Sequence, residues 1–140
     1  MARDEYLQHL AAVPLFSRCT KKQLVEIAKV ADEVIVPAET LLASQGRVGR
    51  ELFIIIDGIA SVTRDGQPVA MATSGDVVGE LAVITGQPRN ATVVAETDLR
   101  MLVLTRGGMN KLLDDIPGLA KQLLYDVTAR LAIATPDGAY

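Results

Sequence analysis

Apolar residues in the first quarter of the chain recur with the period of an α-helix. Between residues 20 and 31 they return every three or four positions, which places them on one helix face. Thr20 and Gln23 have the spacing of a capping box, which satisfies the first free N–H groups of a helix. These features predict a helix over residues 20 to 31. Its apolar face comprises Leu24, Ile27, Ala28 and Ala31.

Helical periodicity also appears on either side of the chain's central part. A weaker pattern covers residues 6 to 12 and ends before Pro14, because the residue preceding a proline is held extended. Phe16 follows and is expected to anchor this region in the core. A second pattern begins after Gly107-Gly108, and Pro136 is expected to end it. The apolar face of that helix comprises Ile116, Leu119, Leu123, Val127 and Leu131. This face either packs on the rest of the domain or forms a short dimer seam.

The central part of the chain has the pattern of β-strands instead. Short runs rich in β-branched and aliphatic residues alternate with glycine or asparagine. Asp65-Gly66 separates two runs and suits a type I′ hairpin turn, which needs positive φ at both central residues, and Asp57-Gly58 resembles a second such turn. The seven runs cover residues 34–36, 41–44, 52–56, 59–63, 68–72, 91–95 and 101–105. Seven or eight strands at this spacing indicate a small barrel or sandwich between helices.

Length and composition narrow the class of protein. A chain of 140 residues is expected to form a single domain over residues 1–140. Its formal net charge of −3 disfavours nucleic acid as a partner of this chain alone. One cysteine and one histidine exclude an intramolecular disulfide and a Cys/His zinc site. The sequence shows no secretory signal and no apolar run of about 18 residues, so we expect a cytoplasmic protein without a membrane span.

One stretch, residues 79–93, interrupts the strands without the pattern of a turn. Gly79 and Gly86 bracket a short segment that can form one or two helical turns. Arg89 offers paired, fixed donors that suit a phosphate. Glu80 can accept hydrogen bonds from sugar hydroxyls. Together these groups predict a site for a ribose phosphate.

The same stretch, GELAVITGQPRNATV, resembles the phosphate-binding cassette of cyclic-nucleotide-binding domains. Its spacing is most similar to that of the regulatory subunits of the cAMP-dependent kinase, and the catabolite activator family is a related branch. VPLF near residue 14, the segment GRVGRELFIIIDG, Gly75-Asp76 and the closing helices extend the resemblance over roughly residues 6 to 133. The resemblance implies an α+β, mainly β fold: an eight-stranded β-roll, a jelly-roll-like barrel, flanked by N-terminal and C-terminal helices.

The resemblance also assigns roles within the cassette. It implies that Glu80 accepts a hydrogen bond from the ribose 2′-hydroxyl and that Arg89 pairs with the exocyclic oxygens of the cyclic phosphate. Gly79, Leu81 and Ala82 would supply backbone contacts, and Asn90 and Ala91 complete the expected ligand-binding set. Asn90 stands where many cAMP binders carry alanine or serine and cGMP-selective members often carry threonine. The choice between cAMP and cGMP therefore stays open, with cAMP favoured.

Two residues of the C-terminal helix are candidates for a lid over the ligand. Arg130 lies at about the place where an arginine of the catabolite activator branch approaches the cassette glutamate. Tyr125 is a candidate for capping the base, and Tyr140 is the other aromatic candidate of this region.

These features favour a cyclic-nucleotide sensor over an enzyme. We expect a stand-alone regulatory domain whose C-terminal helix changes position on binding, and which acts on an effector protein in trans or within a longer chain. The alternative is a docking or oligomerisation module with a vestigial nucleotide site, for example a homodimer through the C-terminal helix. No metal is expected, because the chain has one histidine, His9, and no carboxylate cluster that suggests paired metals.

Overall fold

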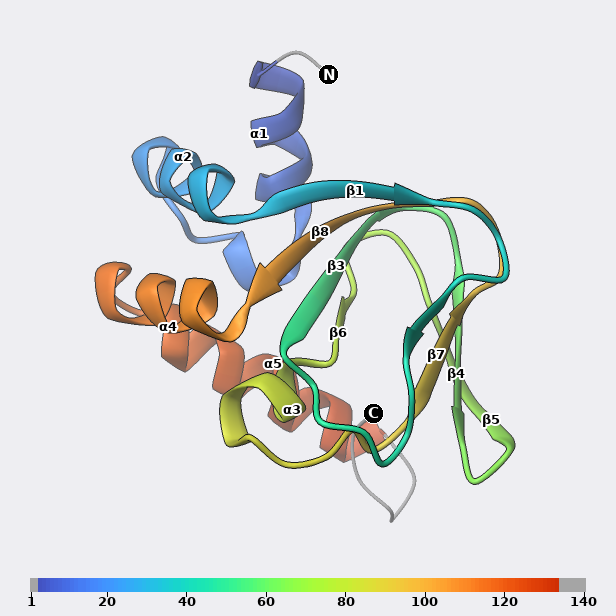
Figure 1. Cartoon of the computed structure of the whole chain (residues 1–140). Coiled ribbons are helices and arrows are strands. Elements are labelled where there is room, and N and C mark those ends of the chain that lie inside the picture. Colours follow the sequence, from blue (N-terminus) through green and yellow to red (C-terminus); the bar gives the residue numbers. More distant parts are fainter. Residues whose placement is uncertain (1–2, 134–140) are drawn as a thin grey trace.

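Two four-stranded antiparallel sheets form a roll, and helices cover one of its sides (Figure 1). The computed structural model describes residues 3–133, with the side chains of residues 5–129. The helices in this range are α1 (Arg3–Ala12), the 3₁₀ turn η1 (Pro14–Phe16), α2 (Lys21–Val30), α3 (Glu80–Thr85), α4 (Arg106–Asp115) and α5 (Leu119–Ile133). The strands are β1 (Asp32–Val36), β2 (Leu41–Ala43), β3 (Glu51–Asp57), β4 (Ala60–Arg64), β5 (Gln67–Ala72), β6 (Val77–Val78), β7 (Thr92–Ala95) and β8 (Leu99–Thr105).

The strand order explains why the two sheets close into a roll. One sheet runs β1-β8-β3-β6 and the other runs β2-β7-β4-β5, so the chain passes repeatedly from one sheet to the other. This arrangement confirms the eight-stranded β-roll with flanking helices. The eighth strand is β6, whose two residues were too short a run to show in the hydrophobic pattern.

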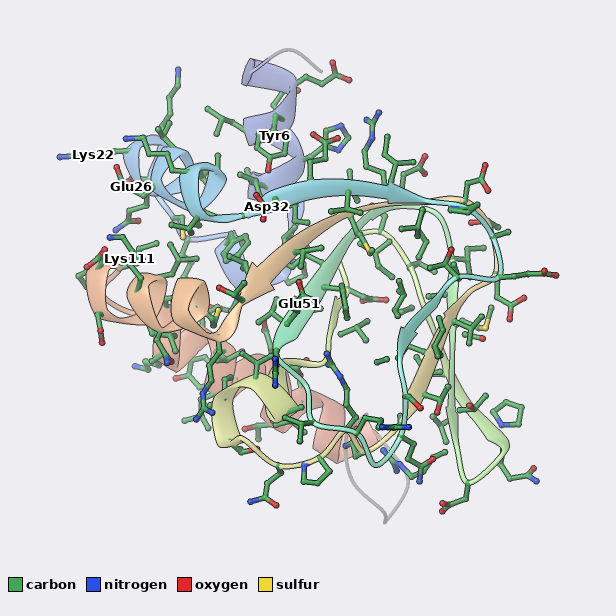
Figure 2. All side chains as sticks on the ribbon, viewed as in Figure 1. Tyr6, Lys22, Glu26, Asp32, Glu51 and Lys111 are labelled. Atoms are coloured by element: carbon green, nitrogen blue, oxygen red, sulfur yellow. The ribbon has the colours of Figure 1, made fainter. Side chains whose placement is uncertain are left out.

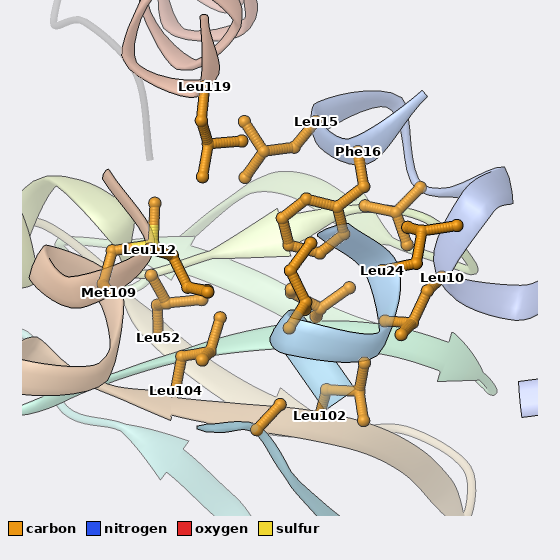
Figure 3. Packing of buried hydrophobic residues seen from close by; sticks show 14 of the residues in the cluster. Leu10, Leu15, Phe16, Leu24, Leu52, Leu102, Leu104, Met109, Leu112 and Leu119 are labelled. Carbon is orange, nitrogen blue, oxygen red and sulfur yellow. The ribbon is translucent and has the colours of Figure 1, made fainter. Parts of the chain in front are cut away.

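Strand β3 is buried on both faces, which accounts for its continuous apolar run. Leu52, Ile54 and Ile56 point to the helices, while Phe53 and Ile55 point between the sheets. On the helical side, Phe16 has no exposed surface and packs in the same cluster as Leu10 and Ile27 of the helices, as the sequence predicts for it (Figure 3). The site described below lies at the N-terminal end of β3, next to Glu51.

The N-terminal helices follow the sequence closely. Helix α2 begins after Thr20, whose hydroxyl accepts from the Gln23 N–H at 3.1 Å while the Gln23 side chain accepts from the Thr20 N–H at 2.9 Å. The predicted capping box is thus confirmed. Val13 is extended ahead of Pro14, also as predicted. In the stretch from residue 3 to residue 133, no helix combines the length and apolarity needed to cross a membrane.

Two predictions from turn and helix signals were wrong. Asp57-Gly58 is not a hairpin turn, because β3 and β4 lie in different sheets and Asp57 lacks positive φ. The C-terminal helical region is two helices, since α4 already begins at Arg106 and Pro117 follows its end before α5 starts. A proline cannot donate the helical hydrogen bond, so the chain turns there, with Gly118 at φ 86°. The expected end at Pro136 lies outside the described residues.

Candidate functional site

The cassette forms a short helix held between two left-handed glycines. Gly79 has φ 86° and precedes α3, and Gly86 has φ 75° and ends it. The Gly86 N–H donates to the Ala82 carbonyl at 3.0 Å, and the Thr85 hydroxyl donates to the Leu81 carbonyl at 2.6 Å. These contacts confirm the predicted helical segment bracketed by glycines, and the positive φ values explain why glycine occupies both ends.

Arg89 is fixed by both its side chain and its backbone. Its Nη2 donates to the carbonyl of Glu51, the first residue of β3 (Figure 2), at 2.7 Å. Its own N–H donates to the Arg47 carbonyl at 2.8 Å, and its carbonyl accepts from the Gly46 N–H at 2.8 Å. The loop before β3 therefore holds the arginine in register, and the strand entry orients its guanidinium.

Two glycines and an aromatic ring confine the guanidinium. A Cβ atom added to Gly49 would lie 2.7 Å from Nε and 2.8 Å from Cζ of Arg89, and one added to Gly79 would collide with Nη1. The Phe53 ring centroid lies 5.6 Å from Cζ, within the range of a cation–π contact. Gly49 and Phe53 were not among the candidate residues. Gly49 is the second glycine of GRVGRE and was visible in the sequence. Its closeness to Arg89 could not be predicted, because it depends on two segments far apart in sequence.

A small pocket collects most of the candidate residues. Gly79, Leu81, Ala82, Arg89, Asn90 and Ala91 line it, together with Ala43, Val78 and Val93. The last three were not predicted as site residues. Ala91 and Val93 are two positions apart on one extended segment and thus face the same side, a periodicity that could have suggested Val93. The wall is small and apolar, and Arg89 and Asn90 contribute its long polar side chains.

Burial distinguishes the two charged residues of the cassette. Glu80 is 0% exposed and Arg89 is 9% exposed, and among the residues whose side chains are described they form the whole buried polar and charged set. Glu80 is adjacent in sequence to two pocket residues, although its side chain is not among those that line the pocket. Buried charges are costly unless they are compensated, which makes these two residues candidates for a functional role.

The electrostatics of Arg89 show what the pocket offers. Burial lowers the pKa of its guanidinium, and the neighbouring Glu51 carboxylate opposes that shift. Arginine nevertheless stays charged in proteins. Its Nη1 is buried and has no hydrogen-bond partner within the described residues. An anion at the pocket could accept from that atom.

The candidate lid residues lie elsewhere or outside the described part. Tyr125 is 53% exposed, with Lys121 Nζ 5.8 Å from its ring centroid, and it lines a separate pocket between the segment after η1 and the start of α5. Arg130 belongs to α5, but its side chain is not described. Tyr140 lies outside the described residues. Around the described residues, no group of three or more His, Cys, Asp or Glu side chains could hold a metal ion.

Comparison with known families assigns this fold to one class. The family model described as the cyclic nucleotide-binding domain matches residues 33–115, which include the whole roll from β2 onward and the cassette. The chain belongs to the cyclic nucleotide-binding domain family. Members of this family of the regulatory-subunit, catabolite-activator and channel type are non-catalytic sensor domains.

Individual relatives agree with the family assignment. The chain is 35% identical over 116 residues to a cyclic nucleotide-gated potassium channel of Rhizobium etli, covering 83% of this chain and 32% of the channel. It is 37% identical over 109 residues to the cAMP-dependent protein kinase regulatory subunit of Schizosaccharomyces pombe, covering 77% of this chain and 26% of that subunit. The solved structure of PfPKA-R bound to cAMP has a TM-score of 0.82 at 25% identity, over 91% of this chain and 44% of that one. The chain thus spans a third or less of the length of these two sequence relatives.

Proposed function

We propose that this domain is a cAMP sensor whose phosphate site is Arg89 and whose ribose site is Glu80. The observation that carries the proposal is the buried guanidinium at the pocket wall, with Nη1 lacking a partner among the described residues. The relatives named as cAMP-dependent kinase regulatory subunits support cAMP over cGMP.

The chemistry of a cyclic nucleotide fits these two charges. Its phosphate carries one negative charge, and the guanidinium gives strong, directional hydrogen bonds to phosphate oxygens. In its ionised form the Glu80 carboxyl would accept hydrogen bonds, and the ribose 2′-hydroxyl can donate one. The anion compensates a cation that is already largely out of water, so little further desolvation of the guanidinium opposes binding.

The remaining cassette residues supply shape and backbone groups. Gly79, Leu81 and Ala82 line the pocket at the start of α3, and Ala91 continues its apolar wall. Small side chains let a ligand approach the backbone closely. Asn90 also lines the pocket, is exposed, and is the residue through which we expect the purine preference to be influenced.

Binding is expected to be reported through helix α5. Leu119 and Leu123 of α5 are buried in the same core cluster as Leu15 of η1 (Figure 3 labels Leu15 and Leu119). A ligand that prefers one arrangement of cassette and helix shifts the population toward it. In this proposal Arg130 and Tyr125 approach the ligand in the bound arrangement, and the signal passes in the cytoplasm to an effector in trans or to another part of a longer chain. Unchanged hydrogen exchange in residues 119–129 at saturating cAMP would contradict it.

Calorimetric titration with cAMP, and separately with cGMP, tests the ligand. The parent protein is expected to bind cAMP more tightly than cGMP. Arg89→Ala removes a charge-assisted hydrogen bond worth about 1.5–3 kcal/mol, so cAMP binding should weaken by roughly ten- to a hundredfold. Arg100→Ala is the matched control, because Arg100 instead pairs with Glu33 at 3.2 Å. Equal affinity in the parent and Arg89→Ala would exclude this site.

The alternative function is a docking module that forms a homodimer through α5. Leu124 and Tyr125 favour it, since these apolar and aromatic side chains are 63% and 53% exposed on that helix. Sedimentation of the nucleotide-free protein separates the two functions. A stable dimer that binds neither nucleotide would support docking, and a nucleotide-binding monomer would exclude it.

A further inference from the structure

The turn between β4 and β5 is fastened to the cassette from outside the pocket. The ladder between β4 and β7 ends at the pair Thr63–Thr92, so Arg64, although it still pairs with Gln67 of β5, has no ladder partner on the β7 side. Arg64 bridges this gap with its side chain, because its Nε donates to the Asn90 carbonyl at 3.0 Å. The Arg64 side chain thus takes the place of a ladder hydrogen bond at Asn90, which lines the pocket and follows Arg89.

The turn itself is locked to the loop that holds Arg89. Asp65 has φ 54°, as the type I′ turn requires. Its N–H donates to Gln45 Oε1 at 2.9 Å, and its Oδ1 accepts from Gln45 Nε2 at 2.8 Å. The Gln45 N–H donates in turn to Thr92 Oγ1 at 3.0 Å. Because the side-chain amide of Gln45 makes two bonds to one residue, the turn cannot pivot without breaking both.

These contacts connect three segments around the pocket. Gly46 and Arg47 bond the backbone of Arg89 on one side, and Arg64 bonds Asn90 on the other. The contact between Gln45 and Asp65 joins the two segments. Figure 1 shows the β4–β5 turn at the same end of the roll as the loop before β3. We call the Arg64–Asn90 and Gln45–Asp65 contacts the hairpin tie.

We propose that the hairpin tie preforms the phosphate site, and that Arg64 is a positioning residue for nucleotide binding. The hairpin tie fixes the backbone of residues 89–91 before the ligand arrives, and this removes from binding the entropic cost of ordering that segment. The inference rests on the proposed function of Arg89. Arg64 is not among the residues that line the pocket, so its effect passes through the Asn90 carbonyl.

Two substitutions separate the donor of Arg64 from its charge. Arg64→Met removes both the Nε donor and the positive charge. Arg64→Gln removes the charge but places an amide Nε2 at the same distance along the side chain, where it can still donate to Asn90. Both retain a side chain of similar width along β4, so the ladder with β7 is expected to survive.

Binding kinetics with cAMP test the proposal at about 0.05 M and about 0.5 M salt. Arg64→Met should raise the dissociation constant by about three- to tenfold, mainly through faster dissociation, and the loss should persist at high salt. Arg64→Gln should remain within about twofold of the parent at high salt, where the lost charge is screened. Equal affinities for the two variants at high salt would overturn the proposal.

Hydrogen exchange of the nucleotide-free proteins gives a readout that does not depend on binding. Arg64→Met should speed exchange of the Arg89 amide, which bonds the Arg47 carbonyl, while the amides of β8 exchange as in the parent. If the parent binds no nucleotide, the proposed function fails, and this comparison still decides whether the tie orders the segment. Unchanged exchange at Arg89 would overturn it.

Discussion

Replacing Gly49 with alanine is expected to displace Arg89 without straining the backbone. Gly49 is buried, and its φ lies outside the left-handed region, so alanine is allowed there conformationally. The new Cβ would lie 2.7 Å from Nε and 2.8 Å from Cζ of Arg89, and 2.9 Å from the Ala82 Cβ. Nonbonded carbon atoms rest at about 3.5–4.0 Å, so the guanidinium must move by roughly 1 Å.

That displacement has a calculable consequence. The hydrogen bond from Arg89 Nη2 to the Glu51 carbonyl is 2.7 Å long, and a shift of about 1 Å away from that carbonyl takes it beyond bonding distance. Overpacking should cost about 1–3 kcal/mol of unfolding free energy. Misplacing the phosphate donor should cost a further 1.5–3 kcal/mol or so of binding free energy, which raises the dissociation constant for cAMP roughly ten- to a hundredfold.

Calorimetry and urea denaturation measure the two effects separately. Gly107→Ala is the matched control, because a Cβ there meets no atom within 4 Å. Since Gly107 lies inside α4, alanine should stabilise the protein by about 0.5–1 kcal/mol and leave cAMP binding unchanged. A folded Gly49→Ala protein that binds cAMP as tightly as the parent would show that confinement of the guanidinium does not set affinity.

Three further substitutions test the fold and its pH dependence. Thr20→Ala removes the cap of α2 and should cost about 0.5–2 kcal/mol in urea denaturation, with cAMP affinity unchanged. Gly58→Ala should cost at least about 1–2 kcal/mol by the same assay, because Gly58 has φ 106° and a Cβ would strike a neighbouring carbonyl. Burial, with Glu33 and Asp32 nearby, raises the pKa of Tyr6 from 10.0 to about 12 (Figure 2 labels Tyr6 and Asp32). Its contribution to stability is therefore full below pH 10 and lost between about pH 10 and 12, where the unfolded state releases the proton first, and Tyr6→Phe should flatten that decline.

Local signals were sufficient for several elements of this fold. The capping box at Thr20 and Gln23 and the turn at Asp65-Gly66 depend on residues within three positions of one another. The glycines that bracket α3 likewise act on the φ of their own residues. Such features depend on neighbouring atoms, so the sequence alone can predict them.

Other features depended on contacts between distant segments. Asp57-Gly58 has the composition of a hairpin turn, but β3 pairs with β8 and β6 in one sheet while β4 pairs with β7 and β5 in the other. The break between α4 and α5, by contrast, had a local signal in Pro117. The pattern of apolar residues continues across this proline, and for that reason it predicted one helix instead of two.

The site divides in the same way. The sequence by itself determined that Glu80 and Arg89 carry the charges of the cassette and that Gly79 and Gly86 flank a short helix. Only the tertiary structure decided that Gly49 and Phe53 enclose the guanidinium, that Glu80 and Arg89 are buried, and that Arg64 reaches Asn90. The physical reason is that burial and close contact are set by which strands meet in the roll, and strand pairing joins residues dozens of positions apart.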